Sequence, residues 1–162
     1  MKLKFLMTYL LLMLLAGCSL HAQDIKPEDV VKITTSSKII PQQEWKEINI
    51  NFILDIKDSW HINSNKPEDL SLTATTLKIA KSKEYAVQKI SYPPASFVKL
   101  EFSENELALY EEQAVIKVVL IIGKNFNESK LTVKGSLQYQ PCNSQTCLFP
   151  VSKPFSIDVK LK

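Results

Sequence analysis

The chain has 162 residues, of which 45% are hydrophobic and 23% charged, and its formal net charge is +3 at pH 7. This length fits one ordinary domain plus a short leader. The lysines are scattered and form no basic stripe, so the charge gives no support for nucleic-acid binding.

The first 17 residues have the composition of an export signal. Lys2 and Lys4 form a positively charged start, and an apolar run follows over residues 5–16, interrupted by Thr8 and Tyr9. A membrane-spanning helix needs about 20 apolar residues, so this run is too short to span a membrane. Without the two leader lysines, the formal net charge falls from +3 to +1.

The end of the apolar run, LAGC at residues 15–18, resembles the lipobox of bacterial lipoproteins. In that family the signal is cut before the cysteine, so Cys18 would carry the lipid that anchors the protein to a membrane. Ser19 resembles the pattern of outer-membrane lipoproteins. The alternative is an ordinary signal peptide cut after Ala22, with bulky Leu20 at the minus-three position. Both alternatives place the domain outside the cytoplasm, in a periplasmic or secreted setting where disulfides persist.

The mature chain is expected to consist of a polar tether over residues 18–29 and a domain over residues 30–162. In residues 47–56, apolar side chains alternate with mostly polar ones, as in a strand with one buried face. Similar but shorter patterns occur at residues 30–34, 75–80, 85–90, 131–139 and 155–160, and residues 114–122 are apolar enough for a central strand. About seven strands without a long amphipathic helix predict an all-β fold, a β-sandwich.

Cys142 and Cys147, with four residues between them, lie near the two feet of a predicted hairpin. Residues that face each other across a hairpin are close enough for a disulfide to form easily. As a structural bridge, the pair would close a short loop and contribute roughly 2 kcal/mol, less than a bridge between distant strands.

A metal site at this pair is not expected, because zinc and copper sites need three or four ligands. All three methionines lie in the leader, and His61 is the domain's histidine. A redox role is compatible with the residues between the cysteines, which carry no charge that would lower a thiol pKa. Such a pair still relays electrons when a partner's thiolate attacks its disulfide. Spacing alone leaves the structural bridge and the redox dithiol both open.

The cysteine segment YQPCNSQTCLFP, residues 139–150, follows WHINS at 60–64, YPP at 92–94 and LYE at 109–111. Together these motifs resemble the N-terminal domain of the thiol:disulfide interchange protein DsbD, the disulfide bond corrector family, over about residues 28–160. The resemblance implies an immunoglobulin-like β-sandwich whose cysteine pair shuttles electrons. It also implies that Cys147 forms the mixed disulfide with a partner and that Cys142 resolves it.

The resemblance further implies a cap loop, bearing an aromatic residue, that covers the disulfide. Phe102 falls at or near the cap position with Glu101 beside it, and the alternative for Phe102 is ordinary core packing. Tyr139 would either pack against the sulfurs or fill its strand.

Two departures from the family pattern affect the expected function. DsbD has a longer spacing between its cysteines, and it also carries membrane and thioredoxin-like domains that these 162 residues lack. The expected partners are therefore thioredoxin-like redox proteins, or a DsbD-type membrane electron carrier, acting in trans, and no cofactor is expected. The alternative function is an immunoglobulin-like binding or assembly module whose disulfide is purely structural.

Overall fold

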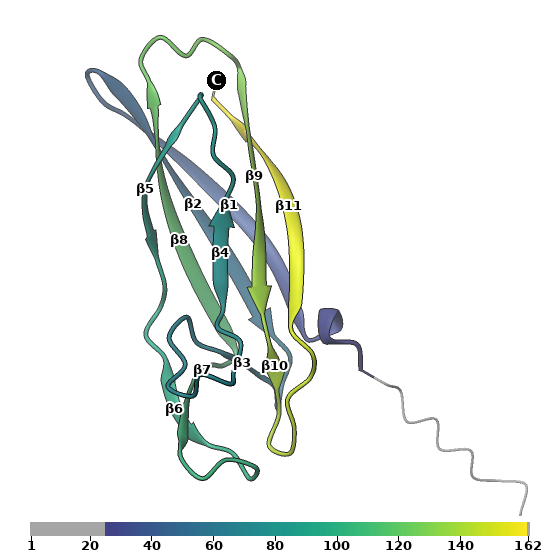
Figure 1. The fold of residues 1–162 in the computed structure, drawn as a ribbon. Coiled ribbons are helices and arrows are strands. Elements are labelled where there is room, and N and C mark those ends of the chain that lie inside the picture. The colour runs from purple at the N-terminus through teal and green to yellow at the C-terminus, as the bar shows by residue number, and fades with distance from the viewer. Residues whose placement is uncertain (1–24, 162) are drawn as a thin grey trace, which may run out of the picture.

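The computed structural model describes residues 25–161 and shows an antiparallel β-sandwich (Figure 1). A short 3₁₀ helix, η1 (Pro27–Asp29), comes before the first strand. The strands are β1 (Val31–Pro41), β2 (Trp45–Ile56), β3 (His61–Asn63), β4 (Thr76–Ile79), β5 (Ala86–Ser91), β6 (Ser96–Lys99), β7 (Glu106–Tyr110), β8 (Gln113–Gly123), β9 (Lys130–Tyr139), β10 (Pro141–Cys142) and β11 (Val151–Lys160). The predicted all-β class is confirmed. The predicted signal and Cys18 lie outside the described residues.

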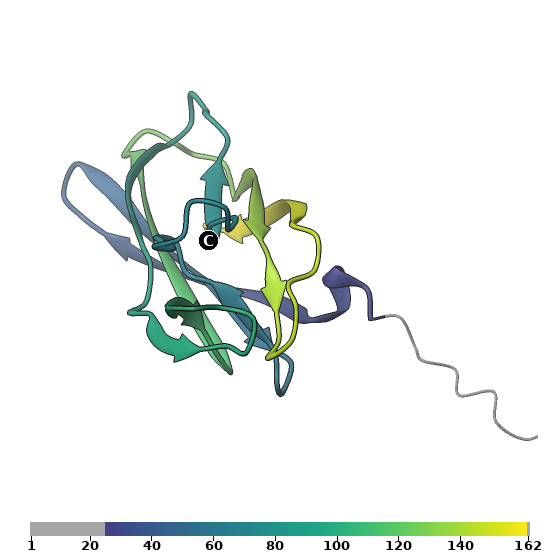
Figure 2. The ribbon, with the colours of Figure 1, turned by 60° about the horizontal axis from the view of Figure 1, so that its bottom comes forward.

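Three sheets build the described part of the molecule. Sheet A has the strand order β1-β2-β8-β5, and sheet C has the order β11-β9-β4. The two views show β2 and β8 on one side of the sandwich and β9 and β11 on the other (Figures 1 and 2). Sheet B, with the order β10-β3-β7-β6, lies at the end of the sandwich away from the C-terminus. The cysteine segment therefore lies at one end of the molecule.

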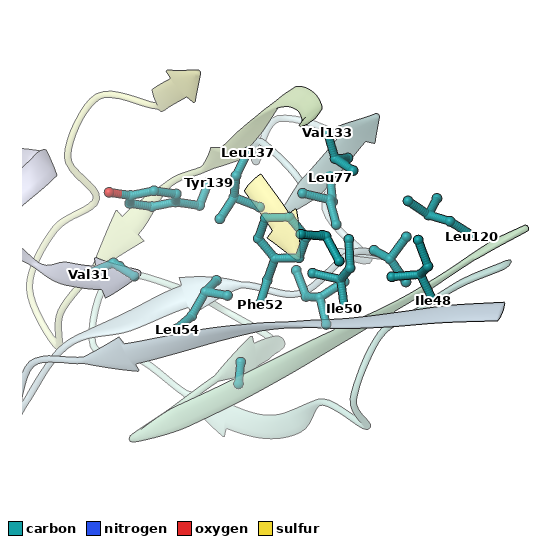
Figure 3. Packing of buried hydrophobic residues seen from close by; sticks show 14 of the residues in the cluster. Val31, Ile48, Ile50, Phe52, Leu54, Leu77, Leu120, Val133, Leu137 and Tyr139 are labelled. Atoms are coloured by element: carbon teal, nitrogen blue, oxygen red, sulfur yellow. The ribbon is translucent and has the colours of Figure 1, made fainter. Parts of the chain in front are cut away.

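Strands β2 and β9 supply the two walls of the main hydrophobic core. Alternate residues of β2 are buried from Ile48 to Ile56, as the period-two pattern predicted. Side chains from β2 and from β9 point toward one another in Figure 3, and the rings of Phe52 and Phe155 meet edge to face at 4.8 Å. Each large apolar side chain buried in this way contributes about 1.5–3 kcal/mol. The main core thus supplies much of the driving force for folding.

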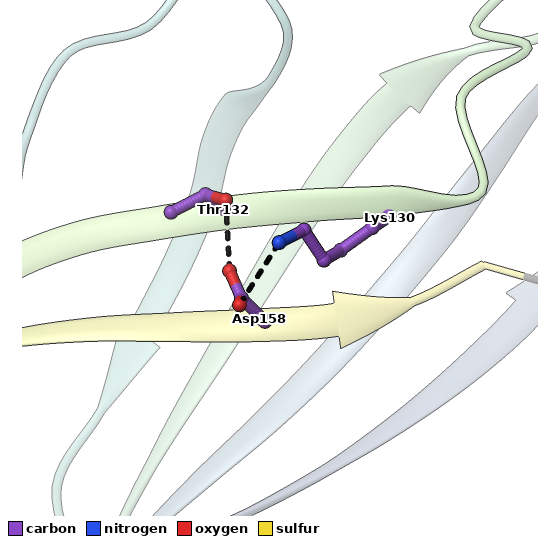
Figure 4. A network of polar contacts seen from close by, with 3 residues as sticks. All are labelled: Lys130, Thr132 and Asp158. Carbon is purple, nitrogen blue, oxygen red and sulfur yellow. Dashed lines mark hydrogen bonds and ion pairs between the residues drawn. The ribbon is translucent and has the colours of Figure 1, made fainter.

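The outer face of sheet C carries a small polar network between β9 and β11 (Figure 4). The Asp158 carboxylate accepts hydrogen bonds from the Thr132 hydroxyl at 2.8 Å and from the Lys130 ammonium at 3.1 Å. The hydrogen bond from Thr132 holds the pKa of Asp158 below its ordinary value, and the hydrogen bond and positive charge of Lys130 act in the same direction. Because the ion pair is exposed, it contributes little to stability.

The structure contains short strands that the sequence pattern did not predict. Strands β3, β6, β7 and β10 are two to five residues long, too short to display a clear period of two. Strand β7 is moreover buried at four consecutive positions, Leu107 to Tyr110. Tyr110 belongs to the main core, whereas Leu107 and Leu109 belong to a second apolar cluster. Burial on both faces explains why β7 shows no alternation.

Candidate redox site at the end of the sandwich

Cys142 and Cys147 form a disulfide across a tight hairpin. Their sulfurs are bonded, their Cα atoms are 4.0 Å apart, and the two residues form an isolated antiparallel bridge. The Leu148 amide donates to the Pro141 carbonyl oxygen at 2.8 Å, which closes the hairpin behind the disulfide. The cysteines therefore lie at the feet of a hairpin, as their position between predicted strands indicated.

The turn between the cysteines is built by Asn143. Its side-chain oxygen accepts hydrogen bonds from the Gln145 and Thr146 amides, both at 2.9 Å. Its own amide donates to the Thr146 carbonyl oxygen at 2.8 Å. An asparagine side chain that imitates a backbone turn in this way removes the need for glycine. The four residues between the cysteines are thus locally ordered.

The two cysteines differ in burial. Cys142 is 0% exposed, whereas Cys147 is half-buried. Cys142 belongs to the second apolar cluster, which we call the cysteine cluster. The buried members of this cluster are Leu100, Leu107, Leu109 and Cys142, with Leu72, Val98 and Cys147 packed against them. Cys147 is consequently the more accessible residue of the pair.

Pairing between β10 and β3 determines which way Cys142 faces. Pro141 pairs with Ile62, and Cys142 pairs with His61. Facing residues of an antiparallel pair share a side of the sheet, and successive residues alternate between sides. Ile62 lies in the main core, so Cys142 faces the opposite side of sheet B, where the cysteine cluster lies. The disulfide is therefore separated from the main core by sheet B.

A buried amide network connects β3 to the cysteine hairpin. Asn63 is 0% exposed, and its side-chain nitrogen donates to the Thr73 carbonyl oxygen and to Gln140 Oε1, both at 3.1 Å. Gln140 Oε1 also accepts the Thr73 amide at 2.8 Å, and Gln140 Nε2 donates to the Leu148 carbonyl oxygen at 3.1 Å. The side-chain oxygen of Asn63 lies 3.8 Å from Cys142 Sγ. The network holds the loop over residues 64–75 and the hairpin together.

The loop between β6 and β7 also contacts the cysteine hairpin. The Glu101 amide donates to the Ser144 carbonyl oxygen at 3.1 Å, so this loop contacts the cysteine turn directly. Leu100 is buried in the cysteine cluster, whereas Phe102 is 43% exposed and lines a hollow of about 260 Å³ with Leu72. The structure thus brings Glu101 and Leu100 to the hairpin. The cap role of Phe102 and Glu101 stays a prediction.

Tyr139 lies in the main core and is fully buried. Among the described residues its hydroxyl has no hydrogen-bond partner. Burial, followed by the nearby carboxylates of Glu28 and Asp29, raises the pKa of Tyr139 to about 12. Of the two alternatives for Tyr139, its membership of the main core favours a strand-filling role.

His61 is a site residue whose pairing with Cys142 the sequence did not indicate. Its Nε2 lies 3.0 Å from Glu111 Oε1, and the pair borders a groove of about 520 Å³ next to Trp60. No lysine, arginine or histidine neighbours the cysteines along the chain, but His61 faces Cys142 across the ladder. The hydrogen-bonded pair of Asn63 and Gln140 was likewise not predicted, although Asn63 belongs to the motif WHINS and Gln140 to the motif YQPC.

Within residues 25–161 the structure shows neither a cluster of potential metal ligands nor a helix long and apolar enough to cross a membrane. The fold and the site together define a β-sandwich domain with a disulfide at one end, formed by one buried and one half-buried cysteine. The chain belongs to the family "Thiol:disulfide interchange protein DsbD, N-terminal", whose model matches residues 26–158. Its fold is therefore immunoglobulin-like, as the resemblance implied.

Two solved structures are similar to this chain. The N-terminal domain of DsbD from Neisseria meningitidis, in the reduced form, has a TM-score of 0.49 and 19% identity, with 85% of this chain and 91% of that chain covered. The N-terminal periplasmic domain of ScsB from Proteus mirabilis has a TM-score of 0.56 and 14% identity. That match covers 85% of this chain and 49% of the ScsB chain. A comparison with curated proteins gives no match.

Proposed function

We propose that this protein carries out thiol:disulfide exchange outside the cytoplasm, with Cys142 and Cys147 cycling between disulfide and dithiol. Its partners are thioredoxin-like redox proteins or a DsbD-type membrane electron carrier acting in trans. Membership of the DsbD N-terminal family supports the reaction class. The observation that carries the proposal is the unequal burial of the two cysteines, because exchange requires one sulfur that a partner's thiolate can approach.

The exchange proceeds through a mixed disulfide. A partner thiolate attacks Cys147 Sγ, the bond between the two cysteines breaks, and Cys142 leaves as a thiolate that takes up a proton. The partner's second thiol then loses its proton and attacks the partner sulfur of the mixed disulfide, which releases Cys147 as a thiolate that also takes up a proton. Two electrons and two protons have moved from the partner to this protein. The difference between the two reduction potentials decides the direction of net flow.

We place the protein in the periplasm, tethered to a membrane, with the outer membrane as the expected location. The similar domain of ScsB is described as periplasmic, which agrees with the export signal in residues 1–17. The proposed anchor is a lipid on Cys18. Mass spectrometry of the mature N-terminus tests this directly: acyl chains on Cys18 support the anchor, and a chain that starts at Gln23 contradicts it.

A trapping experiment tests the exchange. In Cys142→Ser, Cys147 is loaded as a mixed disulfide with thionitrobenzoate and mixed with a reduced thioredoxin-fold protein whose second cysteine is replaced by serine. Attack on Cys147 releases thionitrobenzoate and leaves a covalent complex that no remaining thiol can resolve. The matched control is Cys147→Ser, with thionitrobenzoate on Cys142, which should react far more slowly because Cys142 is buried.

Failure of both variants to form a complex would favour the alternative function, a binding or assembly module whose disulfide is structural. In that case the disulfide should also resist reduction until the fold melts. Rapid complex formation through Cys142 and slow formation through Cys147 would support exchange but reverse the two proposed roles.

A further inference from the structure

The side-chain oxygen of Asn63 faces the buried sulfur of the disulfide at 3.8 Å. In the disulfide this is a contact only, because Cys142 Sγ carries no hydrogen. After reduction the same geometry places a hydrogen-bond acceptor beside a thiol, at a distance suited to a sulfur donor. Asn63 and Cys142 are both 0% exposed, so water does not compete for this contact.

The orientation of the Asn63 amide follows from backbone groups whose polarity is fixed. The carbonyl oxygens of Thr73 and Leu148 can only accept hydrogen bonds, and the Thr73 amide can only donate. Gln140 therefore points its nitrogen at Leu148 and its oxygen at the Thr73 amide. Asn63 must then donate with its nitrogen to the Thr73 carbonyl and to Gln140 Oε1. A flipped Asn63 amide would set its oxygen against two acceptors, so the oxygen is left facing Cys142.

We propose that Asn63 holds reduced Cys142 in the protonated thiol form, with the S–H donating to Asn63 Oδ1. An acceptor beside a buried sulfur favours the neutral thiol, because a thiolate there would meet the negative end of the amide dipole. The inference rests on the proposed exchange function and assigns a role within it. Asn63 contacts the reacting sulfur, and Gln140 is a positioning residue that fixes the direction of the Asn63 amide.

The consequence for exchange is that the two sulfurs have different roles, Cys142 as the leaving group and Cys147 as the thiol that ionises. When a thiolate attacks Cys147, the departing Cys142 sulfur takes up a proton, and its S–H then donates a hydrogen bond to Asn63 Oδ1. A leaving group with a high pKa departs slowly, so small thiols should reduce the disulfide slowly. In the reduced protein, Cys147 is the thiol that ionises first. Asn63 thus selects Cys147 as the nucleophile when the reduced protein attacks a partner's disulfide, whereas the greater exposure of Cys147 makes it the sulfur that a partner's thiolate attacks.

The charged groups around Cys142 are few. His61 faces it from β3 and bonds to Glu111, so a positive charge on His61 would be offset by that carboxylate. The loop between β6 and β7 carries Glu101, whose amide contacts the cysteine turn, and the loop over residues 64–75 carries Asp69, which borders the hollow near Leu72. These carboxylates act in the same direction as Asn63. Substitutions at Asn63 alone therefore separate its effect from that of the neighbouring charges.

The test is a residue-resolved titration of the reduced full chain, with carbon-13 at the cysteine Cβ atoms and nuclear magnetic resonance as the readout. In the unsubstituted protein, Cys142 should titrate above the ordinary cysteine value of about 8.5 and above Cys147. A Cys142 that titrates at or below Cys147 would overturn the inference. This measurement needs no variant and so remains decisive if a substitution prevents folding.

Substitutions then assign the effect to Asn63. Asn63→Ala should lower the Cys142 pKa and give about tenfold more thiolate at pH 7, whereas Asn63→Asp should raise the pKa. The matched control is Thr75→Val, which removes the buried hydrogen bond from the Thr75 hydroxyl to the Asn63 backbone carbonyl oxygen and leaves the amide in place. Thr75→Val should weaken the fold without moving the Cys142 pKa.

Equal pKa values in the unsubstituted protein, Asn63→Ala and Thr75→Val would show that Asn63 is only structural. That result would leave the trapping experiment unaffected, because trapping reports whether Cys147 exchanges and the titration reports which group controls Cys142. If no trapped complex forms but the pKa of Cys142 is raised, the exchange function is wrong, and the role of Asn63 in keeping Cys142 protonated still holds.

Discussion

At the scale of single residues, some buried polar groups are hydrogen-bonded and others are not. Asn63 and Gln140 satisfy each other and the surrounding backbone, which makes the cysteine end rigid. The Tyr139 hydroxyl is buried in the main core with no hydrogen-bond partner among the described residues. A buried polar group without a partner costs about 1–3 kcal/mol. Tyr139 is therefore a site where stability can be gained.

Tyr139→Phe should leave stability at neutral pH unchanged or raised, because it removes an unpaired buried hydroxyl. The pKa of Tyr139 is raised from 10.0 to about 12, so between these pH values the unfolded chain loses the phenol proton while the folded chain keeps it. Stability should accordingly fall as pH rises from 10 to 12. Denaturant unfolding across this range should show a steeper fall for the unsubstituted protein than for Tyr139→Phe. An equal fall in unfolding free energy for both proteins would show that the Tyr139 phenol does not cause it.

At the scale of elements, sheet C depends on one close approach between its strands. Gly135 on β9 pairs with Ile79 of β4 on one side and with Phe155 of β11 on the other. A Cβ at this position would overlap the Lys78 carbonyl oxygen and lie 2.5 Å from Phe155 Cζ. The position thus needs glycine for space.

Gly135→Ala should destabilise the protein by about 1–3 kcal/mol, because backbone and ring must move apart to admit the methyl group. The matched control is Gly123→Ala at the end of β8, where a Cβ would meet nothing within 4 Å. Gly123→Ala should be neutral or stabilising by up to about 1 kcal/mol, through the unfolded state. Denaturant unfolding of the two variants checks this. Equal effects at both positions would show that the close approach is not limiting.

The long elements could be predicted from the sequence, whereas the short ones could not. Residues 47–56 reveal their strand through local alternation, and the cysteine hairpin follows from its place between two such patterns. Strands β3 and β10 share two residue pairs that are about 80 positions apart in the chain, and the Asn63–Cys142 contact depends on them. No local pattern encodes such a pairing. The cysteines could thus be identified from the sequence, whereas the residues that surround them could be identified only once the fold was known.

At the scale of the whole molecule, the described residues form two apolar clusters, and the disulfide lies in the smaller cluster, apart from the main core. The main core lies between sheets A and C, and the cysteine cluster lies on the far side of sheet B. The disulfide closes a short loop within the smaller cluster. We therefore expect its bond to break and form without a change in the main core.

Reduction of the Cys142–Cys147 disulfide should cost about 2 kcal/mol of folding free energy, the value that chain entropy gives for a loop this short. The protein should stay folded, with amide hydrogen exchange accelerated in the hairpin over residues 141–148 and unchanged in β2 and β8. Hydrogen exchange of the oxidised and reduced forms measures both effects. Unfolding on reduction would show that the bridge is a structural element of the domain.

In the proposed function, the disulfide is a relay that a docked partner activates. The most direct measurement is its reduction rate in the folded protein, with a reduced thioredoxin-fold protein and with glutathione at equal thiolate concentrations, followed by alkylation and mass spectrometry. We predict that the protein partner reduces it more than about tenfold faster, since docking aligns its thiolate with Cys147. Equal rates, or reduction by either reagent only after the fold has melted, would rule out activation of the disulfide by docking.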